Sequence, residues 1–329
     1  MKIIKWGIRG TGYIANRFAD GMAEAEGASL VAVCSRTLDS AKKFADRHRA
    51  KQVFTDYRAF LAEADIDVLY LATPNDLHYE EIIQALEAGI PVLSEKPIVD
   101  NAWQLEAVRA KAAEKDLFWM EGMWTRFFPA TQKLAEWLRE GRIGEIVTVK
   151  ADFSYPMDPD KDQPWKAGIS NHAGSLRDVG IYSLALADLA FPQLPNRLEY
   201  SVSLNGEVDD RIQLFLDYGD GKVAFLSSAF THEGSSRAEI IGTKGQIFLG
   251  PEFWHPTSVT LVSNSKVLEE FTDPYPATGF QYEIEEVGHC LRQGLKESPY
   301  YDWQATERIA ELIESTRKRF GLVYPSDRD

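Results

Sequence analysis

Residues 2–15 read KIIKWGIRGTGYIA, and this order of residue types predicts a strand, a tight turn and a helix. The apolar run up to Ile8 is typical of a strand, and residues 10–15 fit the pattern G-x-G-x-x-A. Glycines lack a Cβ, so the backbone can approach a pyrophosphate group held at the helix N-terminus. A glycine pair can also form a plain turn, but the flanking strand and helix favour a dinucleotide site.

Outward from this stretch, short apolar runs alternate with helical patterns as far as about residue 120. Strands are expected at residues 2–8, 28–34, 66–72 and 90–95. Residues 67–72 are apolar on both faces of the expected strand, as in a central strand covered by helices on each side. The pattern predicts an α/β domain with a doubly wound parallel sheet over residues 1–121.

A different pattern begins after Pro129, where a helix is expected to run to Glu140. Strands then dominate, separated by glycine-containing turns typical of antiparallel hairpins. They are expected near residues 145–155, 197–204, 211–218, 222–231, 237–241 and 257–263, with helices near 174–190, 279–294 and 303–320. Residues 122–329 are therefore expected to form a second domain of α+β type.

Composition excludes several classes of protein. The 329 residues carry a net charge of −14, which disfavours a broad surface for nucleic acid or anionic lipid. The two cysteines, Cys34 and Cys290, and the six histidines show no metal-ligand spacing, so no metal site is expected. No apolar run approaches the about 20 residues of a membrane span, and no signal sequence is recognisable. A soluble, cytoplasmic protein is expected.

The end of the second strand indicates which dinucleotide is bound. NAD enzymes commonly place Asp or Glu here, whereas this chain has Cys34, Ser35 and Arg36. A hydroxyl and a guanidinium suit a 2′-phosphate, because Arg offers a planar fork of donors with fixed positive charge. The alternative is a solvated loop arginine, and NADP is favoured over NAD.

Two further loops follow the carboxyl ends of the strands at 66–72 and 90–95. The first contains Thr73, Pro74, Asn75 and His78, and the second contains Glu95, Lys96 and Pro97. Ligands of open α/β sheets bind at this edge, so Lys96 is expected to face the nicotinamide end of the site. The alternative is a surface lysine that precedes a helix.

In the second domain, Asp178 and Tyr182 stand four residues apart, hence on one face of the expected helix. A nearby ammonium favours the phenolate, so such a tyrosine could move a proton as a carbinol is oxidised. The alternative is an N-capping Asp and a core Tyr. Four aromatic residues stand at the predicted domain junction or at predicted strand or loop ends: Trp124, Phe153, Trp254 and Phe280. Taken singly, each is an ordinary core residue.

These elements together resemble the glucose-fructose oxidoreductase/inositol dehydrogenase (Gfo/Idh/MocA) family over essentially the whole chain, chiefly through Glu95-Lys96-Pro97. Residues 120–129 (MEGMWTRFFP) and 290–299 (CLRQGLKESP) are similar to the dimeric dihydrodiol dehydrogenase branch, whose members also act as NADP-dependent D-xylose dehydrogenases. The resemblance implies a Rossmann domain, then a substrate-binding domain whose open, mostly antiparallel sheet makes a homodimer.

The resemblance also implies roles for individual residues. Lys96 and Tyr182 would form the catalytic pair with Asp178 nearby, and Phe153 and Trp254, with Phe280, would line an aromatic substrate pocket. Motifs and resemblance together predict cofactor contacts at Gly7, Gly10, Thr11, Gly12, Tyr13, Ile14, Ser35, Arg36, Thr73, Pro74, Asn75, His78, Glu95, Lys96, Trp124 and Arg126.

The sequence departs from common family patterns at three places. Many sugar dehydrogenases of the family carry His in place of Tyr182 and Asp in place of Arg36, and both departures favour the dihydrodiol-like branch. Residues 173–175 (AGS) stand where relatives often have a run of glycines. That change is expected to alter the approach to the substrate side.

The expected activity is NADP(H)-dependent hydride transfer to or from a carbinol of a sugar, polyol or dihydrodiol. One alternative is a sugar or inositol dehydrogenase that uses NAD or NADP, with Lys96 as the acid/base. Another is a dinucleotide-binding sensor without turnover.

Overall fold

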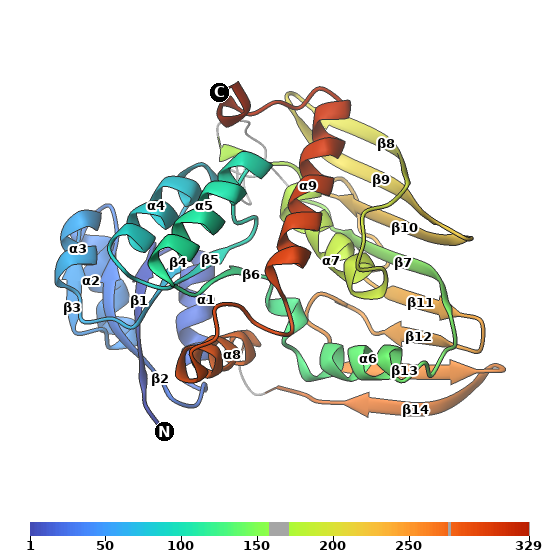
Figure 1. The fold of residues 1–329 in the computed structure, drawn as a ribbon, viewed down its shortest axis with the longest axis horizontal. Coiled ribbons are helices and arrows are strands. Elements are labelled where there is room, and N and C mark those ends of the chain that lie inside the picture. Colours follow the sequence, from blue (N-terminus) through green and yellow to red (C-terminus); the bar gives the residue numbers. More distant parts are fainter. Residues whose placement is uncertain (158–170, 276–277, 329) are drawn as a thin grey trace. The chain divides into compact units, whose positions relative to one another are not determined.

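The computed structural model describes residues 1–157, 171–275 and 278–328, which fall into two compact units (Figure 1). The first unit is Met1–Trp124 with Tyr275–Trp303, and the second is Thr125–Pro274 with Gln304–Asp329. This division differs from the expected one, because the first boundary lies after Trp124 and the chain later returns to the first unit.

The returning segment joins the first unit through side chains that pack on its first helix. Phe280 makes an edge-to-face contact with Phe18 at 5.6 Å between ring centroids, and Thr278 Oγ1 donates to the carbonyl of Arg17. The contacting residues are far apart in the sequence, so no local pattern predicts these contacts.

The first unit contains the expected doubly wound parallel sheet, with strand order β3-β2-β1-β4-β5-β6. The strands are β1 Ile4–Arg9, β2 Ala28–Cys34, β3 Gln52–Phe54, β4 Val68–Leu71, β5 Val92–Glu95 and β6 Trp119–Gly122. Strands β3 and β6 were not expected, because three or four residues are too short to show a period. The helices are α1 Tyr13–Met22, α2 Leu38–His48, α3 Tyr57–Glu63, α4 Asn75–Glu87, α5 Ala102–Lys115 and α8 Phe280–Gln293.

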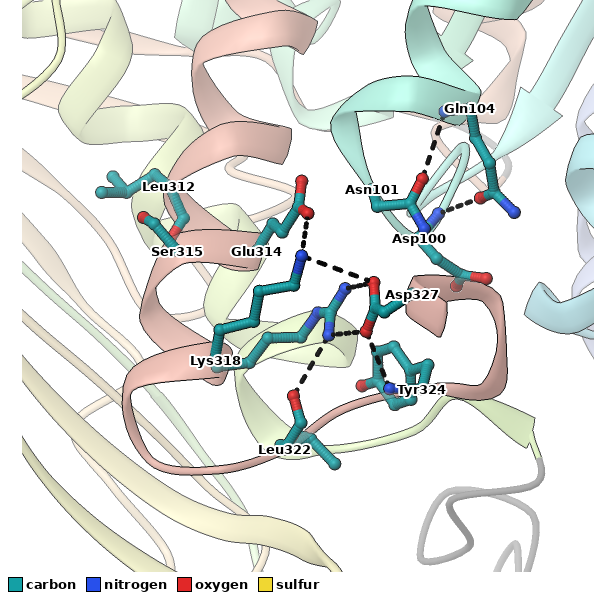
Figure 2. A network of polar contacts seen from close by, with 11 residues as sticks. Asp100, Asn101, Gln104, Leu312, Glu314, Ser315, Lys318, Leu322, Tyr324 and Asp327 are labelled. Carbon is teal, nitrogen blue, oxygen red and sulfur yellow. Dashed lines mark hydrogen bonds and ion pairs between the residues drawn. The ribbon is translucent and has the colours of Figure 1, made fainter. Parts of the chain in front are cut away.

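Strand β1 lies where the strand order reverses, between β2 and β4. At its end, Arg9 pairs with Cys34 on one side and Leu71 on the other. Three loops therefore begin at one edge of the sheet. Helix α5, which follows the loop after β5, is capped at its start: Asn101 Oδ1 accepts from Gln104 N, and Gln104 Oε1 accepts from Asp100 N (Figure 2).

The second unit is built on an eight-stranded sheet of order β14-β13-β12-β11-β7-β10-β9-β8. The strands are β7 Ile146–Ser154, β8 Arg197–Asn205, β9 Val208–Gly219, β10 Lys222–Ala229, β11 Ala238–Gly242, β12 Gln246–Leu249, β13 Ser258–Ser263 and β14 Lys266–Thr272. Among the described strands of this sheet only β7 and β10 pair in parallel, so it is mostly antiparallel, as predicted. Strands β12 and β14 were not expected.

Helices α6 (Pro129–Arg139), α7 (Ile181–Ala190) and α9 (Trp303–Arg319, in this unit from Gln304) lie over this sheet (Figure 1). The helix expected at 174–190 begins instead with a π-helical turn, Leu176–Gly180, which runs into α7. The turn lies close against β10, because a Cβ added at Gly180 would come within 2.9 Å of Ser228 Oγ. No helix in the described ranges is long and apolar enough to cross a membrane.

Candidate active site

The glycine loop after β1 forms an open backbone cradle. Gly10 has φ +104°, and a Cβ there would run into the Ala72 carbonyl, so glycine is required. Gly12 is exposed, and a Cβ there would meet no atom within 4 Å. No side chain in the described structure caps α1, which starts at Tyr13. The amides of this helix start can therefore bind an anion.

Gly12→Ala provides a direct check on this cradle. The residue has φ −74°, which alanine adopts without strain, so the variant should fold with an unchanged melting temperature. An added methyl would fill the space that a pyrophosphate needs, and overpacking costs about 1–3 kcal/mol. We expect the Kd for NADP(H) to rise about tenfold or more by fluorescence titration. An unchanged Kd would place the phosphates elsewhere.

The end of β2 joins the same edge. Ser35 is buried with its Oγ 2.9 Å from Thr11 Oγ1, whereas Arg36 is exposed. The first acidic side chain after the strand, Asp39, makes an ion pair with Lys43 at 2.9 Å on α2. The geometry thus offers a hydroxyl and a guanidinium beside the glycine loop.

A buried ion pair that the sequence analysis missed braces these loops. Arg9 Nε lies 2.8 Å from Glu81 Oε1, and Glu81 Oε2 accepts from Thr73 Oγ1 at 2.8 Å. The Arg9 guanidinium also stacks over Tyr57, whose hydroxyl donates to the Glu81 carbonyl. The one sequence feature that could have indicated this ion pair is the arginine immediately before the glycine loop.

His78 links the loop after β4 to the loop after β5. Its Nδ1 lies 2.9 Å from the Pro97 carbonyl and its Nε2 lies 2.9 Å from the Thr73 carbonyl. Burial lowers the pKa of His78, and the two carbonyls oppose that effect only in part. A neutral imidazole has one N–H, so it donates to one carbonyl at a time. His78 therefore braces the loops from inside, and its contact with cofactor stays a prediction.

The Lys96 loop is anchored by a second residue that sequence analysis missed, Glu121 on β6. Its Oε1 accepts from Ile98 N at 2.9 Å, and its Oε2 accepts from Tyr301 OH at 2.6 Å. Lys96 itself is half-buried, and the preceding Glu95 accepts from Tyr70 OH at 2.5 Å. The loop is thus held at Pro97 by His78 and at Ile98 by Glu121.

Glu283 on α8 lies in the same buried layer. Neither of its carboxyl oxygens has a hydrogen-bond partner in the part of the chain that the structure describes. Burial first, then the charges of Glu95 and Glu121, raise the pKa of Glu283 well above its ordinary value. Burial and the two neighbouring carboxyl groups therefore favour the neutral acid form of Glu283. Only tertiary packing brings it to the strand ends, so sequence could not indicate it.

In the second unit, the structure brings Tyr182, Phe153 and Trp254 together. Phe153 on β7 stacks on Trp254 at 3.4 Å between centroids, with 6° between the ring planes. The Phe153 ring also lies 5.8 Å from the Tyr182 ring. Asp178 is half-buried in the π-helical turn, two residues before Gly180, which precedes α7. A tyrosine beside an aromatic wall is the arrangement expected for a substrate pocket.

Asp209 on β9 holds the start of the π-helical turn. Its Oδ2 accepts from Leu176 N and from Ser175 Oγ, both at 2.7 Å. Burial raises the pKa of Asp209 to about 6, with a smaller contribution from Asp210, while these two hydrogen bonds and that from its own amide oppose the rise. This residue, too, was missed by sequence analysis, because an acidic pair at a strand start normally indicates a solvated edge.

The raised pKa of Asp209 predicts a pH dependence of stability. The folded pKa exceeds the unfolded value of 3.8, so the stabilising contribution is present below pH 3.8 and is lost as pH rises through about 6. The difference between the folded and unfolded pKa values corresponds to about 3 kcal/mol of stability, at about 1.4 kcal/mol per tenfold change in proton affinity. Urea unfolding of wild type and Asp209→Asn should therefore show wild type losing stability relative to the variant between pH 4 and pH 7. Parallel pH profiles would contradict this.

The remaining predicted residues fall in both units. Gly7 is buried in β1, where a Cβ would clash with Phe60 and Ile66, so it has a packing role and its cofactor contact stays a prediction. Trp124 stacks on Phe280 at 4.5 Å in the first unit, whereas Arg126 donates to the Ala185 carbonyl in the second.

The structure therefore brings some predicted partners together and not others. Phe280 packs with Phe18 and Trp124, and its place in a pocket with Phe153 remains a prediction. Lys96 belongs to the first unit and Tyr182 to the second, so their pairing also remains a prediction.

Comparison with known proteins gives the class. The family model described as "Oxidoreductase family, NAD-binding Rossmann fold" of GFO/IDH/MocA matches residues 4–123, and the GFO/IDH/MocA C-terminal domain matches residues 131–248. The chain belongs to the GFO/IDH/MocA family of oxidoreductases, which confirms the resemblance drawn from the sequence.

Individual relatives cover nearly the whole chain. The trans-1,2-dihydrobenzene-1,2-diol dehydrogenases of Bos taurus and Homo sapiens are each 31% identical over 99% of this chain and 99% of their own. A 3-ketoreductase from Actinomadura kijaniata, solved with NADP and TDP-benzene, has 28% identity and a TM-score of 0.82 over 96% of this chain and 98% of its own. An aldose-aldose oxidoreductase from Caulobacter crescentus shares the fold, with 24% identity and a TM-score of 0.86 over 98% of this chain and all of its own.

Proposed function

We propose that this protein is an NADP(H)-dependent dehydrogenase or reductase that interconverts a carbinol and a carbonyl on a sugar, polyol or dihydrodiol. The observation that carries the proposal is the convergence of the glycine loop, the Ser35–Arg36 turn and the braced Lys96 loop at one edge of the parallel sheet. The aromatic wall around Tyr182 supplies a matching substrate side.

The residues divide into those that bind and those that move a proton. Gly10 and Gly12 allow the pyrophosphate to approach, and Arg36 binds the 2′-phosphate through its fork of donors. When bound, the nicotinamide supplies or accepts the hydride. Lys96 faces the substrate oxygen and favours the phenolate form of Tyr182.

Tyr182 is the proposed acid/base. It takes the hydroxyl proton when a carbinol is oxidised and returns it when a carbonyl is reduced. Asp178, from the turn before α7, binds a second substrate hydroxyl or tunes the pair. Phe153 and Trp254 present a flat apolar surface to the substrate ring.

Support for NADP comes from two sources. The loop after β2, residues 35–37 (SRT), carries no carboxylate to bind ribose hydroxyls, and the next acidic residue, Asp39, pairs with Lys43 on α2. The 3-ketoreductase structures of this fold were solved with NADP. The same enzyme was also studied with a lysine replaced by alanine and with a tyrosine replaced by phenylalanine, the two residue types proposed here as the catalytic pair.

The test is a substrate screen. Purified protein is mixed with NADP or NAD and with aldoses, inositols and trans-dihydrodiols in turn, while absorbance of the reduced nicotinamide is followed. We expect turnover with NADP on at least one class of diol or aldose. Cofactor binding without reduction of any carbinol would instead support a dinucleotide-binding sensor.

We further propose that the protein acts in the cytoplasm as a homodimer that pairs through the open face of the eight-stranded sheet. The strand register aligns one row of side chains across that face, with large exposed aromatics among opposite charges. The row contains Phe215, Phe225, Lys150, Glu239 and Phe248. Phe225 is 49% exposed, and Lys150 makes an ion pair with Glu239 at 3.0 Å. Mixed apolar and charged surfaces of this kind suit a second copy related by a twofold axis.

Both cysteines are free and buried, which fits a reducing cytoplasm.

Phe225→Asp should dissociate the dimer, because it places a charge at the centre of the apolar surface. We expect sedimentation velocity to report a monomer for the variant and a dimer for wild type. The matched control is Leu38→Asp on α2, where an equally exposed leucine (51%) lies outside this sheet. A dimer that survives Phe225→Asp would place the interface elsewhere.

A further inference from the structure

The C-terminal segment after α9 is built around one fully buried aromatic residue, Tyr324. Two arginines lie over its ring, with Arg317 Cζ at 4.4 Å and Arg177 Cζ at 5.0 Å from the ring centroid. His172 stacks on the same ring at 4.8 Å with 22° between the planes. Tyr324 thus joins the chain end to residues 172–177.

An ion pair closes the segment on itself (Figure 2). Both Arg317 Nη atoms contact the Asp327 carboxylate, at 2.5 and 2.7 Å, and each side chain is only 1% exposed. Arg317 Nη1 also donates to the Leu322 carbonyl, and Tyr324 N donates to Asp327 Oδ2 at 2.8 Å. The tail is therefore a closed loop in which Tyr324 has a fixed position.

The Tyr324 hydroxyl contacts the segment that precedes the π-helical turn. It donates to the Ala173 carbonyl at 2.8 Å. Asp209 on β9 binds the next residues, Ser175 and Leu176, and a Cβ added at Gly174 would run into the Asp209 carboxylate. The tail therefore holds Ala173 and β9 holds residues 174–176, in the segment that leads to Asp178.

We propose that Tyr324 is a positioning residue for the reaction, which sets the backbone of residues 173–180 and through it the placement of Asp178 and Tyr182. The inference rests on the proposed function, in which those two residues face the substrate. It assigns the C-terminal segment a role in the active site that acts through the backbone of residues 173–180.

Two substitutions separate the hydroxyl from the ring. Tyr324→Phe keeps the ring in contact with the arginines but loses the hydrogen bond to Ala173, and Tyr324→Leu loses both. Val323→Ala, at a neighbouring position that is 38% exposed, is the control. Each full-length variant is measured for hydrogen exchange of residues 172–182, for kcat and KM, and for the Kd of NADPH.

We expect faster exchange across residues 172–182 in both variants, with Val323→Ala unchanged. The kcat should fall about 2- to 10-fold in Tyr324→Phe, as loss of one hydrogen bond implies, and about 100-fold in Tyr324→Leu, as a displacement near 1 Å implies. The Kd of NADPH should stay within about twofold of wild type, because the glycine loop belongs to the other unit.

Unchanged exchange in residues 172–182, or exchange that rises without any loss of kcat, would overturn the inference. If Tyr324→Leu fails to fold, Tyr324→Phe alone decides, since the ring is retained. A wild-type protein inactive on every carbinol would refute the proposed function by a different observation, while hydrogen exchange would still decide whether Tyr324 sets this segment.

Discussion

Replacing Tyr182 with phenylalanine should lower kcat about 100- to 10,000-fold, the usual contribution of a positioned proton-transfer group. The substitution removes only the hydroxyl, and the ring remains beside Phe153 and the Phe153–Trp254 stack. Packing is therefore preserved, so the loss should appear in kcat while the Kd of NADPH and the melting temperature stay near wild type. Steady-state kinetics with the best substrate of the screen, together with fluorescence titration, provide the measurement.

Tyr200→Phe is the matched control, since Tyr200 lies on β8 and is 36% exposed. Lys96→Met separates the two candidate acid/base groups. If Tyr182 transfers the proton, Lys96→Met should shift the tyrosine limb of the pH profile upward, because an ammonium that favours the phenolate is lost. Near-normal turnover of Tyr182→Phe, with loss of that limb in Lys96→Met, would assign the role to Lys96 instead.

Arg36→Asp should reverse the cofactor preference. Loss of a charge-assisted hydrogen bond to phosphate costs about 1.5–3 kcal/mol, or about 10- to 100-fold in affinity for NADP. The new carboxylate repels the 2′-phosphate and can accept hydrogen bonds from the ribose hydroxyls of NAD. We expect kcat/KM for NADP to fall and that for NAD to rise, so their ratio changes by about 100-fold or more.

The control for this charge change is Arg109→Asp, an exposed arginine on α5 whose ion pair with Glu106 lies on the helix surface. It alters the net charge equally and should leave the ratio within about twofold. If Arg36→Asp weakens the binding of NADP and NAD equally, Arg36 contributes only nonspecific electrostatic attraction to the cofactor. Another group must then select the 2′-phosphate.

The parts of the fold that could be predicted are those with local patterns. The residues of β1 and the glycine loop indicate their own structure, because a strand, a positive-φ glycine and a helix start are contiguous. Strand β4 was recognisable because a central strand is apolar on both faces. The return of Phe280 to the first unit has no local signal, since it depends on packing against Phe18 about 260 residues earlier.

The candidate site divides in the same way. Ser35 and Lys96 follow strand ends, and the ends of parallel strands meet at one edge whatever else the chain does. Glu121, Asp209 and Glu283 could not be predicted, because each acts through a neighbour that only the tertiary structure supplies. Their common property is burial of a carboxyl group, which no sequence pattern reports.

The route of the chain through the two units also bears on how the protein is made. Residues 125–274 are synthesised after the body of the first unit but before its last helix, α8. Domains usually fold in order as they leave the ribosome, yet here the nucleotide-binding unit cannot be completed until residue 303 has emerged. Until then the apolar surface around Phe18 is uncovered and Glu283 is missing from its buried layer. A nascent chain arrested before α8 should therefore hold an incomplete, aggregation-prone nucleotide-binding unit that becomes protease-resistant only after residues 275–303 have emerged.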